Sequence, residues 1–255
     1  MLNAFDLSGK VAIITGGNGG LGLGIAKGLA KAGSAVAIAG RNQDKLDSAS
    51  AELKAIGAQV LTVQADVSIE DDVNRMVKET VEHFGRVDIL VNNAGISWGV
   101  KTEEMSLELW DKFMAVDLTS VFLCSKACYP EMVKAGGGKI INISSFITKK
   151  GFGKLAHYAA AKGGMDHMSQ SLAEGWGKDN IQVNVIVCGL FDTDMNPCSV
   201  PEPAPILTYM IEKTPAKRAG LPADLEGLSI FLASKSSDFV TGALIVIDGG
   251  FSLAI

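Results

Sequence analysis

The chain has 255 residues, of which 47% are hydrophobic and 20% are charged, and this composition excludes an intrinsically disordered protein. A net charge of −5, from 23 Lys and Arg against 28 Asp and Glu, gives no electrostatic reason to expect nucleic acid or an anionic membrane as a partner. Four cysteines without Cys-x-x-Cys spacing, no apolar leader and no apolar run of about 20 residues together favour a cytoplasmic protein with free thiols.

Short β-branched runs alternate with segments of helical period along the chain. In chain order, strands are expected at 10–15, 35–39, 60–63, 87–91, 139–143, 182–186 and 244–247. Helices are expected at about 20–32, 43–56, 69–84, 107–134 and 157–177. Continuous apolar strands indicate burial on both faces, and strands separated by helices favour right-handed crossovers within a parallel sheet. The expected fold is α/β: one domain over 1–255, with a doubly wound, Rossmann-type parallel sheet of about seven strands and helices on both faces.

One segment, residues 194–220, interrupts this alternation. It contains five prolines, namely Pro197, Pro201, Pro203, Pro205 and Pro215. A long Pro-rich insertion after a strand is either a functional cover for a site or a tolerated surface loop. Because it follows the sixth strand at the edge where such sheets bind ligands, we expect a substrate lid.

A glycine-rich turn lies between the first strand and the first helix, in the sequence Thr15-Gly-Gly-Asn-Gly-Gly-Leu-Gly22. Glycine permits positive φ and lets the backbone approach a ligand closely. The N-terminus of the next helix offers free N–H groups and a positive dipole end to a pyrophosphate. A merely flexible turn is the alternative, but the position between strand and helix favours a dinucleotide site. The residues expected to contact the cofactor here are Gly16, Asn18, Gly20, Leu21 and Gly22.

The end of the second strand bears on the choice between NADP and NAD. Many dinucleotide folds carry an acidic residue there to hold the ribose hydroxyls, whereas this chain has Gly40 followed by Arg41 and Asn42. A guanidinium group favours a 2′-phosphate, so NADP(H) is the preferred cofactor and NAD(H) the second choice. Arg41 could instead simply flank the next helix. Asp66, next to Val67, could hydrogen-bond the adenine amino group or cap the helix that begins near residue 69.

Tyr158 and Lys162 stand four residues apart, so on a helix they share one face. A phenol has a pKa of about 10, too high for acid–base work near neutral pH unless a nearby positive charge favours the phenolate. The ammonium group of Lys162 and a positively charged nicotinamide would supply that charge, so we expect a lowered pKa for Tyr158. The spacing alone occurs often by chance, and other motifs must support it.

Those motifs are present. Asn92-Asn93-Ala94-Gly95 follows the fourth strand, and Ser145 precedes Tyr158 by thirteen residues. With the glycine turn and Lys162, this pattern resembles the short-chain dehydrogenase/reductase family in order and spacing, over nearly the whole chain from Gly9 to Gly250. Residues 181–193 and 240–242 resemble the branch that includes glucose 1-dehydrogenases, sugar-acid dehydrogenases and 3-oxoacyl reductases.

This resemblance implies a role for each matching residue. Tyr158 would be the acid in carbonyl reduction and the base in alcohol oxidation, and Lys162 would lower its pKa and bind the nicotinamide ribose. Ser145 would hydrogen-bond the substrate oxygen and stabilise its developing charge. Hydride would pass between C4 of the nicotinamide and the carbonyl carbon. The remaining cofactor contacts implied are Asn93, Ala94 and Gly95 beside the riboses, and Gly189 and Thr193 beside the nicotinamide amide.

Two positions depart from the family pattern. Asp117 stands where the family usually carries an Asn that holds a water in a proton relay to Lys162. We expect Asp117 to keep a catalytic role with a changed pH profile, because its carboxylate would oppose the lowering of the Tyr158 pKa; it could also be an ordinary helix residue. Cys188 replaces the Pro that usually precedes Gly189 and would lie near the nicotinamide.

Several side chains follow the strand ends, where a substrate must lie: Ser144, Trp98, Phe146, Phe152, Leu190 and Phe191. Each could belong to the core, but together they predict a substrate pocket with apolar walls. No His, Cys and carboxylate cluster has the spacing of metal ligands, so no metal is expected. Cys124 and Cys128 are better explained as packed thiols.

The sequence therefore predicts an NAD(P)-dependent oxidoreductase that acts on a carbonyl or secondary alcohol in a small molecule, with a sugar, sugar acid or related ketone favoured. By analogy with the family we expect a homotetramer. One alternative is a 3-oxoacyl thioester reductase, whose phosphopantetheine could bind Lys149, Lys150 and Lys154. The other is a non-catalytic NADP(H)-binding sensor, against which the intact Ser145, Tyr158 and Lys162 argue.

Overall fold

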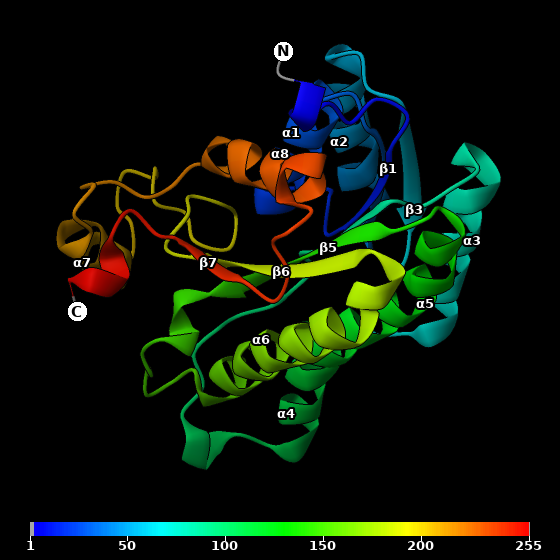
Figure 1. The fold of residues 1–255 in the computed structure, drawn as a ribbon. Coiled ribbons are helices and arrows are strands. Elements are labelled where there is room, and N and C mark those ends of the chain that lie inside the picture. Colours follow the sequence, from blue (N-terminus) through cyan, green and yellow to red (C-terminus); the bar gives the residue numbers. More distant parts are fainter. Residues whose placement is uncertain (1–2, 255) are drawn as a thin grey trace.

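A seven-stranded sheet with the order β3-β2-β1-β4-β5-β6-β7 runs through the centre of the computed structural model, which describes residues 3–254 (Figure 1). Every neighbouring pair of strands is parallel. The strands are β1 (Val11–Thr15), β2 (Ala35–Gly40), β3 (Val60–Gln64), β4 (Ile89–Asn92), β5 (Gly138–Ser145), β6 (Ile181–Cys188) and β7 (Leu244–Ile247). The prediction of a doubly wound parallel sheet is confirmed.

Helices cover both faces of this sheet, and each face has its own core. On one face lie α1 (Gly20–Lys31), α2 (Gln43–Ala55) and α8 (Glu226–Ala233). On the other lie α3 (Glu70–Phe84), α5 (Ser120–Lys134) and α6 (Ala156–Trp176). Cys124 and Cys128 are buried in the second core, as expected for packed thiols. No helix among residues 3–254 has the length and apolar character needed to cross a membrane.

The single helix predicted over 107–134 is interrupted. α4 (Leu107–Met114) leads into a π-helical turn over Ala115–Thr119, and α5 begins at Ser120. A π-turn widens the helix by one residue and is often found at functional sites. This one carries Asp117, which is fully buried. Apolar periodicity does not report such a local insertion, which is why the sequence predicted one continuous helix.

Segment 194–220 contains a helix that the sequence analysis did not predict, α7 (Pro205–Lys213). Pro205 occupies its first turn, where the missing N–H has no helical partner to lose. Leu207 and Met210 pack with Leu190 and Phe251 in a small third core. Short helix α8, which follows a 3₁₀ turn at Pro222–Leu225, was also not expected. Both helices have only eight or nine residues, too few for a clear periodic pattern.

Candidate active site

A cavity of about 1520 Å³ lies at the carboxyl ends of the strands. It is lined by the glycine turn, by the residues that follow β2 to β6, and by the segment that leads into α7. All the predicted catalytic, cofactor and pocket residues line it except two, Gly22 and Asp117. The cavity therefore brings together residues from widely separated parts of the chain.

The glycine turn holds α1 close to the end of β1. Gly16 and Gly20 have φ angles of 64° and 50°, a region that L-residues with side chains rarely adopt. A Cβ at Gly22 would collide with the carbonyl oxygen of Gly16 and would lie 2.5 Å from Nδ2 of Asn93. Gly22 therefore permits the close packing of helix and turn; it does not line the cavity, and its contact with the cofactor stays a prediction.

Asn93, which follows β4, holds the glycine turn in place through hydrogen bonds. Its Nδ2 donates to the carbonyl oxygens of Thr15 and Gly16 at 3.0 and 3.2 Å. The hydroxyl of Thr15 accepts from the backbone N–H groups of Asn93 and Ala94 at 3.0 and 3.1 Å. Thr15, which the sequence analysis did not single out, therefore fixes the turn against β4. A hydroxyl at the last position of the first strand was the signal available.

The end of the cavity next to β2 carries the expected basic residue and a second one. The guanidinium of Arg41 is 64% exposed, and its Nη1 lies 3.9 Å from Oδ2 of Asp66. Lys45, one helical turn along α2, also lines the cavity, and its Nζ lies 2.8 Å from Oδ2 of Asp194. Sequence reasoning missed Lys45, although its spacing of four residues from Arg41 places it near the same strand end.

Two neighbouring side chains have definite structural partners. Oδ1 of Asn42 accepts from the backbone N–H of Lys45 at 2.9 Å and caps α2. Oδ1 of Asp66 accepts from the N–H of Ser68 at 3.0 Å, while the N-cap position of α3 belongs to Ile69. The cap alternative for Asp66 is therefore wrong.

The packing of Asn18 explains why the end of β2 carries Gly40 and no acidic residue. A Cβ there would lie 2.7 Å from Nδ2 of Asn18, whose side chain covers the glycine. Asn18 thus occupies part of the space that a larger residue at position 40 would need.

Ser145, Tyr158 and Lys162 converge at the other end of the cavity. Ser145 ends β5 and lies beside the side chain of Tyr158 on α6, where its hydroxyl acts to lower the pKa of the phenol. Nζ of Lys162, in a side chain that is almost fully buried, donates to the carbonyl oxygen of Ile143 at 2.9 Å and lies 5.7 Å from the centroid of the Tyr158 ring. The helical spacing of Tyr158 and Lys162 thus sets both side chains beside the serine at the strand end.

Asp117 lies behind Lys162, outside the cavity lining. Its Oδ1 is 3.8 Å from Nζ of Lys162 and accepts from the backbone N–H of Ile96 at 3.2 Å. Position 95 must be glycine for this approach, because a Cβ there would lie 2.6 Å from Oδ1 of Asp117. Burial raises the pKa of Asp117 to about 6, and the neighbouring Lys162 opposes that rise.

The expected lowering of the Tyr158 pKa is not what the side chains around it produce. Removal of the phenol from water raises its pKa above the ordinary value, and the nearby Asp117 and Cys188 raise it further, whereas the hydrogen bond with Ser145 lowers it. Burial lowers the pKa of Lys162, against the attraction of Asp117. The prediction rested on the ammonium of Lys162 and a positively charged nicotinamide. It allowed that Asp117 would oppose the lowering, but it did not count desolvation, which is the largest cause of the rise.

Cys188 lines the cavity as the last residue of β6, and burial raises the pKa of its thiol to about 12. The following residue, Gly189, donates its backbone N–H to Ile247 of β7 at 2.9 Å. That N–H is therefore engaged within the sheet. Thr193 lies near Gly20, with its methyl group 3.5 Å from where a Cβ on that glycine would be.

Apolar side chains surround the space beyond Tyr158. Trp98 packs on Phe113 with ring centroids 4.5 Å apart, and Phe113 packs on the buried His157. Phe146 makes edge contacts with Phe152 and Phe251. Segment 194–220, in which the sequence analysis expected a substrate lid without naming single residues, adds Met195, Asn196, Ile206, Leu207 and Met210 to the lining.

Three further predicted pocket residues line the same end of the cavity as Tyr158. They are Ser144 in β5 and Leu190 and Phe191, which follow β6. Ser144 is 2% exposed, and its Oγ has no hydrogen-bond partner among the residues that the structure describes. Leu190 and Phe191 are buried, and Phe191 also packs against Gly220. The pocket walls are therefore mainly apolar, as the sequence predicted.

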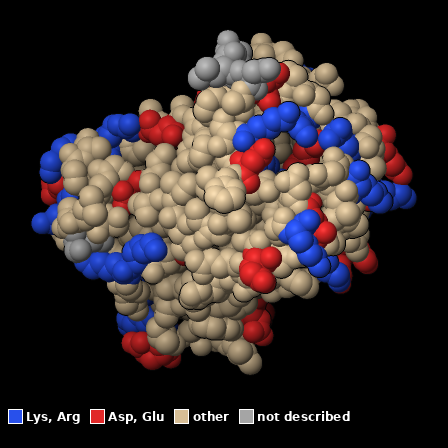
Figure 2. Space-filling view, in the orientation of Figure 1, with Lys and Arg blue, Asp and Glu red and all other residues tan. Residues whose placement is uncertain are grey.

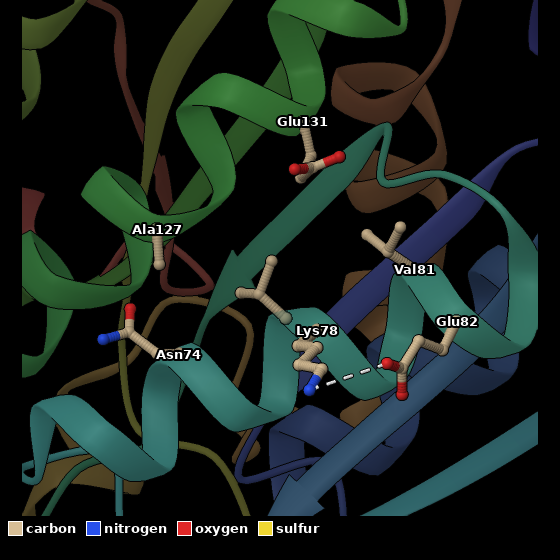
Figure 3. Close-up of a pocket in the computed structure, with 7 residues that line it drawn as sticks. Asn74, Lys78, Val81, Glu82, Ala127 and Glu131 are labelled. Carbon is tan, nitrogen blue, oxygen red and sulfur yellow. Dashed lines mark ion pairs between the residues drawn. The ribbon is translucent and has the colours of Figure 1, made fainter.

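A second hollow, of about 290 Å³, lies between α3 and α5 (Figure 3). It is lined by Val77, Val81 and Ala127 together with Asn74, Lys78, Glu82 and Glu131. Lys78 pairs with Glu82 at 3.8 Å within α3, and both side chains are mostly exposed. This hollow holds no group of acid, base and nucleophile, and among residues 3–254 no cluster of three or more His, Cys, Asp or Glu side chains could hold a metal ion.

Comparison with known proteins places this geometry in a family. The family model described as short chain dehydrogenase matches residues 10–203. The chain is 40% identical over 255 residues to a 2-dehydro-3-deoxy-D-gluconate 5-dehydrogenase of Formosa agariphila, covering 100% of this chain and 97% of that protein. It is 36% identical over 251 residues to the gluconate 5-dehydrogenase of Gluconobacter oxydans, covering 98% of each chain.

Solved structures of dehydrogenases have the same fold. A gluconate 5-dehydrogenase from Burkholderia cenocepacia, crystallised with NADP and tartrate, is 35% identical and superposes with a TM-score of 0.93 over 100% of this chain and 99% of that one. A gluconate dehydrogenase from Agrobacterium tumefaciens is 34% identical, with a TM-score of 0.93 over 99% of each chain. With the Ser145, Tyr158 and Lys162 geometry, these similarities show that the chain belongs to the short-chain dehydrogenase/reductase family of oxidoreductases.

Proposed function

We propose that the chain is an NADP(H)-dependent oxidoreductase that interconverts a secondary alcohol and a ketone in a sugar acid. The observation that carries this proposal is one continuous cavity with the glycine turn and Arg41 at one end and Ser145 and Tyr158 at the other. Its relatives include enzymes named for gluconate and for 2-dehydro-3-deoxy-D-gluconate, which supports the sugar-acid class.

The residues present fit a dinucleotide. The positive φ of Gly16 and Gly20 leaves a side-chain-free cradle at the N-terminus of α1, where a pyrophosphate would bind. Arg41 and Lys45 would face a 2′-phosphate, and Lys162 would hold the nicotinamide ribose. Asn93 would act mainly by fixing the turn, with Ala94, Gly95, Val67 and Thr193 as lining contacts.

The chemistry proposed for the protein groups is a proton transfer at the substrate oxygen. Nicotinamide supplies or accepts the hydride when it is bound. In reduction, the hydroxyl of Ser145 donates a hydrogen bond to the carbonyl oxygen, and the phenol of Tyr158 gives its proton to the oxygen as negative charge develops there. A raised pKa keeps Tyr158 protonated and suits it to this direction. Lys162, anchored by Ile143 and Asp117, keeps a positive charge beneath the tyrosine.

We propose that 1–255 form one domain in which segment 194–220 serves as the substrate lid, in a cytoplasmic homotetramer. Burial of Leu207 and Met210 against the pocket end supports the lid.

The surface of the protein bears on the proposed tetramer. Figure 2 shows few charged atoms over the middle of the face that carries α6, β7 and α8. The exposed apolar residues Phe239, Val246 and Leu253 support an interface between copies. Sedimentation of the purified protein as a monomer would exclude the tetramer.

An assay of several substrates with each of the two cofactors tests the proposed function. Cofactor absorbance is followed with NADPH and NADH against gluconate, 5-keto-D-gluconate, uncharged ketones and a 3-oxoacyl thioester. We expect turnover of the sugar-acid pair with a preference for NADP(H). Turnover of the thioester alone would favour the 3-oxoacyl reductase. Tight NADPH binding without any turnover would favour the sensor.

Arg41→Ala should weaken NADPH binding about 10- to 100-fold and leave NADH binding nearly unchanged. The reason is that a charged hydrogen bond to phosphate contributes about 1.5–3 kcal/mol, reduced here because the guanidinium is largely exposed. Dissociation constants from quenching of protein fluorescence measure the effect. Equal losses for the two cofactors would show that Arg41 does not read the 2′-phosphate.

A further inference from the structure

The charged residues that line the cavity divide into paired and unpaired groups. Six charged side chains line it: Arg41, Lys45, Asp66, Lys154, Lys162 and Asp194. Five of them have an opposite charge within 4 Å, in the pairs Arg41–Asp66 at 3.9 Å, Lys45–Asp194 at 2.8 Å and Lys162–Asp117 at 3.8 Å. Lys154 makes no ion pair with any residue that the structure describes. It is therefore the one lining cation whose charge is uncompensated within the described chain.

Lys154 also differs from the other lining charges in its place. Arg41, Asp66 and Lys45 follow or flank the ends of β2 and β3, at the adenosine end of the proposed cofactor site, and Lys162 lies beneath Tyr158. Lys154 stands between β5 and α6, four residues before Tyr158, among Trp98, Phe152 and Leu155 in the apolar part of the lining. A ligand in this part of the cavity would meet apolar walls and one cation.

Local packing holds Lys154 at this position. Its carbonyl oxygen accepts from the backbone N–H of Val100 at 2.9 Å, which ties the loop before α6 to the loop after β4. The side-chain stem passes over Gly99, where a Cβ would lie 3.3 Å from Cβ and 3.7 Å from Cδ of Lys154. Glycine at position 99 therefore leaves space for the aliphatic stem of Lys154. The ammonium group of Lys154 remains available to bind a ligand.

We propose that Lys154 binds the carboxylate of the substrate and so makes the enzyme select hydroxy and keto acids over uncharged alcohols and ketones. This rests on the proposed function and adds the residue that recognises the acid group. A carboxylate entering an apolar pocket loses hydration and needs a compensating partner, and an ammonium group without another counter-ion supplies one. Because Lys154 is exposed to solvent, screening keeps its contribution moderate.

Lys154→Met tests this proposal because methionine keeps an unbranched stem and removes the charge. Reduction of 5-keto-D-gluconate is compared with reduction of an uncharged ketohexose such as D-fructose. We expect KM for the keto acid to rise about tenfold, a change of about 1.4 kcal/mol, with kcat little changed and with no comparable change for the uncharged ketose. Lys154→Arg should restore most of the affinity for the acid.

Lys150→Met is the matched control, because Lys150 is an exposed lysine of the same loop that does not line the cavity. It should leave both substrates unaffected. A Lys154→Met variant that changes the two substrates equally, or changes neither, would overturn the proposal while the parent's turnover of the keto acid still supports the proposed function. If the parent turns over only uncharged ketones or a phosphate-bearing thioester, the sugar-acid function and the role of Lys154 both fail.

Discussion

Replacing Tyr158 with Phe should lower kcat about 10²- to 10⁴-fold, the range that a positioned general acid or base contributes. The phenol hydroxyl of Tyr158 lies at the cavity surface together with Ser145, and phenylalanine keeps the ring and its packing. NADPH affinity should stay within a few-fold of the parent value, since Arg41, the glycine turn and Lys162 are unchanged. Steady-state kinetics with 5-keto-D-gluconate and fluorescence titration with NADPH measure the two quantities.

Tyr129→Phe provides the matched control for the loss of a phenol hydroxyl. Tyr129 lies on α5, packs on Trp176 and donates to Asp179 at 2.8 Å, outside the lining of the active-site cavity. This variant should turn over at the parent rate. A Tyr158→Phe protein that matches the parent as well would show that the proton comes from another group, and the mechanism proposed above would be wrong.

Replacing Lys162 with Met should lower the free energy of unfolding by about 3–5 kcal/mol at pH 8, because it leaves the buried carboxylate of Asp117 without its counter-charge. Both side chains are at most 5% exposed, so water cannot take the place of the ammonium. Chemical denaturation at fixed pH measures the change. Adding Asp117→Asn to Lys162→Met should recover a large part of the loss, because the amide has no charge to compensate.

The pH dependence of this loss has a definite sign. The pKa of Asp117 is about 6 in the folded chain and 3.8 without the fold, so the native state binds the proton more tightly. Its contribution to stability is therefore present at low pH and disappears as pH rises from about 4 through 6. In Lys162→Met the native pKa rises further, since Lys162 lowers it in the parent. Destabilisation should thus be smaller at pH 5 than at pH 8; a loss independent of pH would exclude Asp117 as its source.

The sheet and the main site were predictable because their signals are local. Each strand is a short apolar run, and the spacing of Tyr158 and Lys162 on a helix determines that they share a face. Strand boundaries moved by no more than two residues, as at β5 and β6, which extend to Ser145 and Cys188. The carboxyl ends of the strands then gather the polar residues that follow them.

The parts that were not predictable depend on tertiary contacts. The pairing of Lys45 with Asp194 joins residues far apart in sequence, and Asp117 reaches Lys162 only in the folded chain. The π-turn at Ala115–Thr119 and helix α7 are too short for apolar periodicity to reveal them. The prediction that the pKa of Tyr158 is lowered was wrong because that pKa also depends on tertiary contacts. Desolvation is the largest cause of the raised pKa and Asp117 adds to it, whereas the sequence analysis counted the ammonium of Lys162 and a positively charged nicotinamide.

The packing of Asn18 over Gly40 has a consequence for the evolution of cofactor choice. An acidic residue at position 40, which would suit the ribose hydroxyls of NAD, would arrive in space that Asn18 occupies and next to the guanidinium of Arg41. A larger residue at position 40 therefore requires a change in the glycine turn at the same time. In descendants of this chain, positions 18, 40 and 41 should vary as a set.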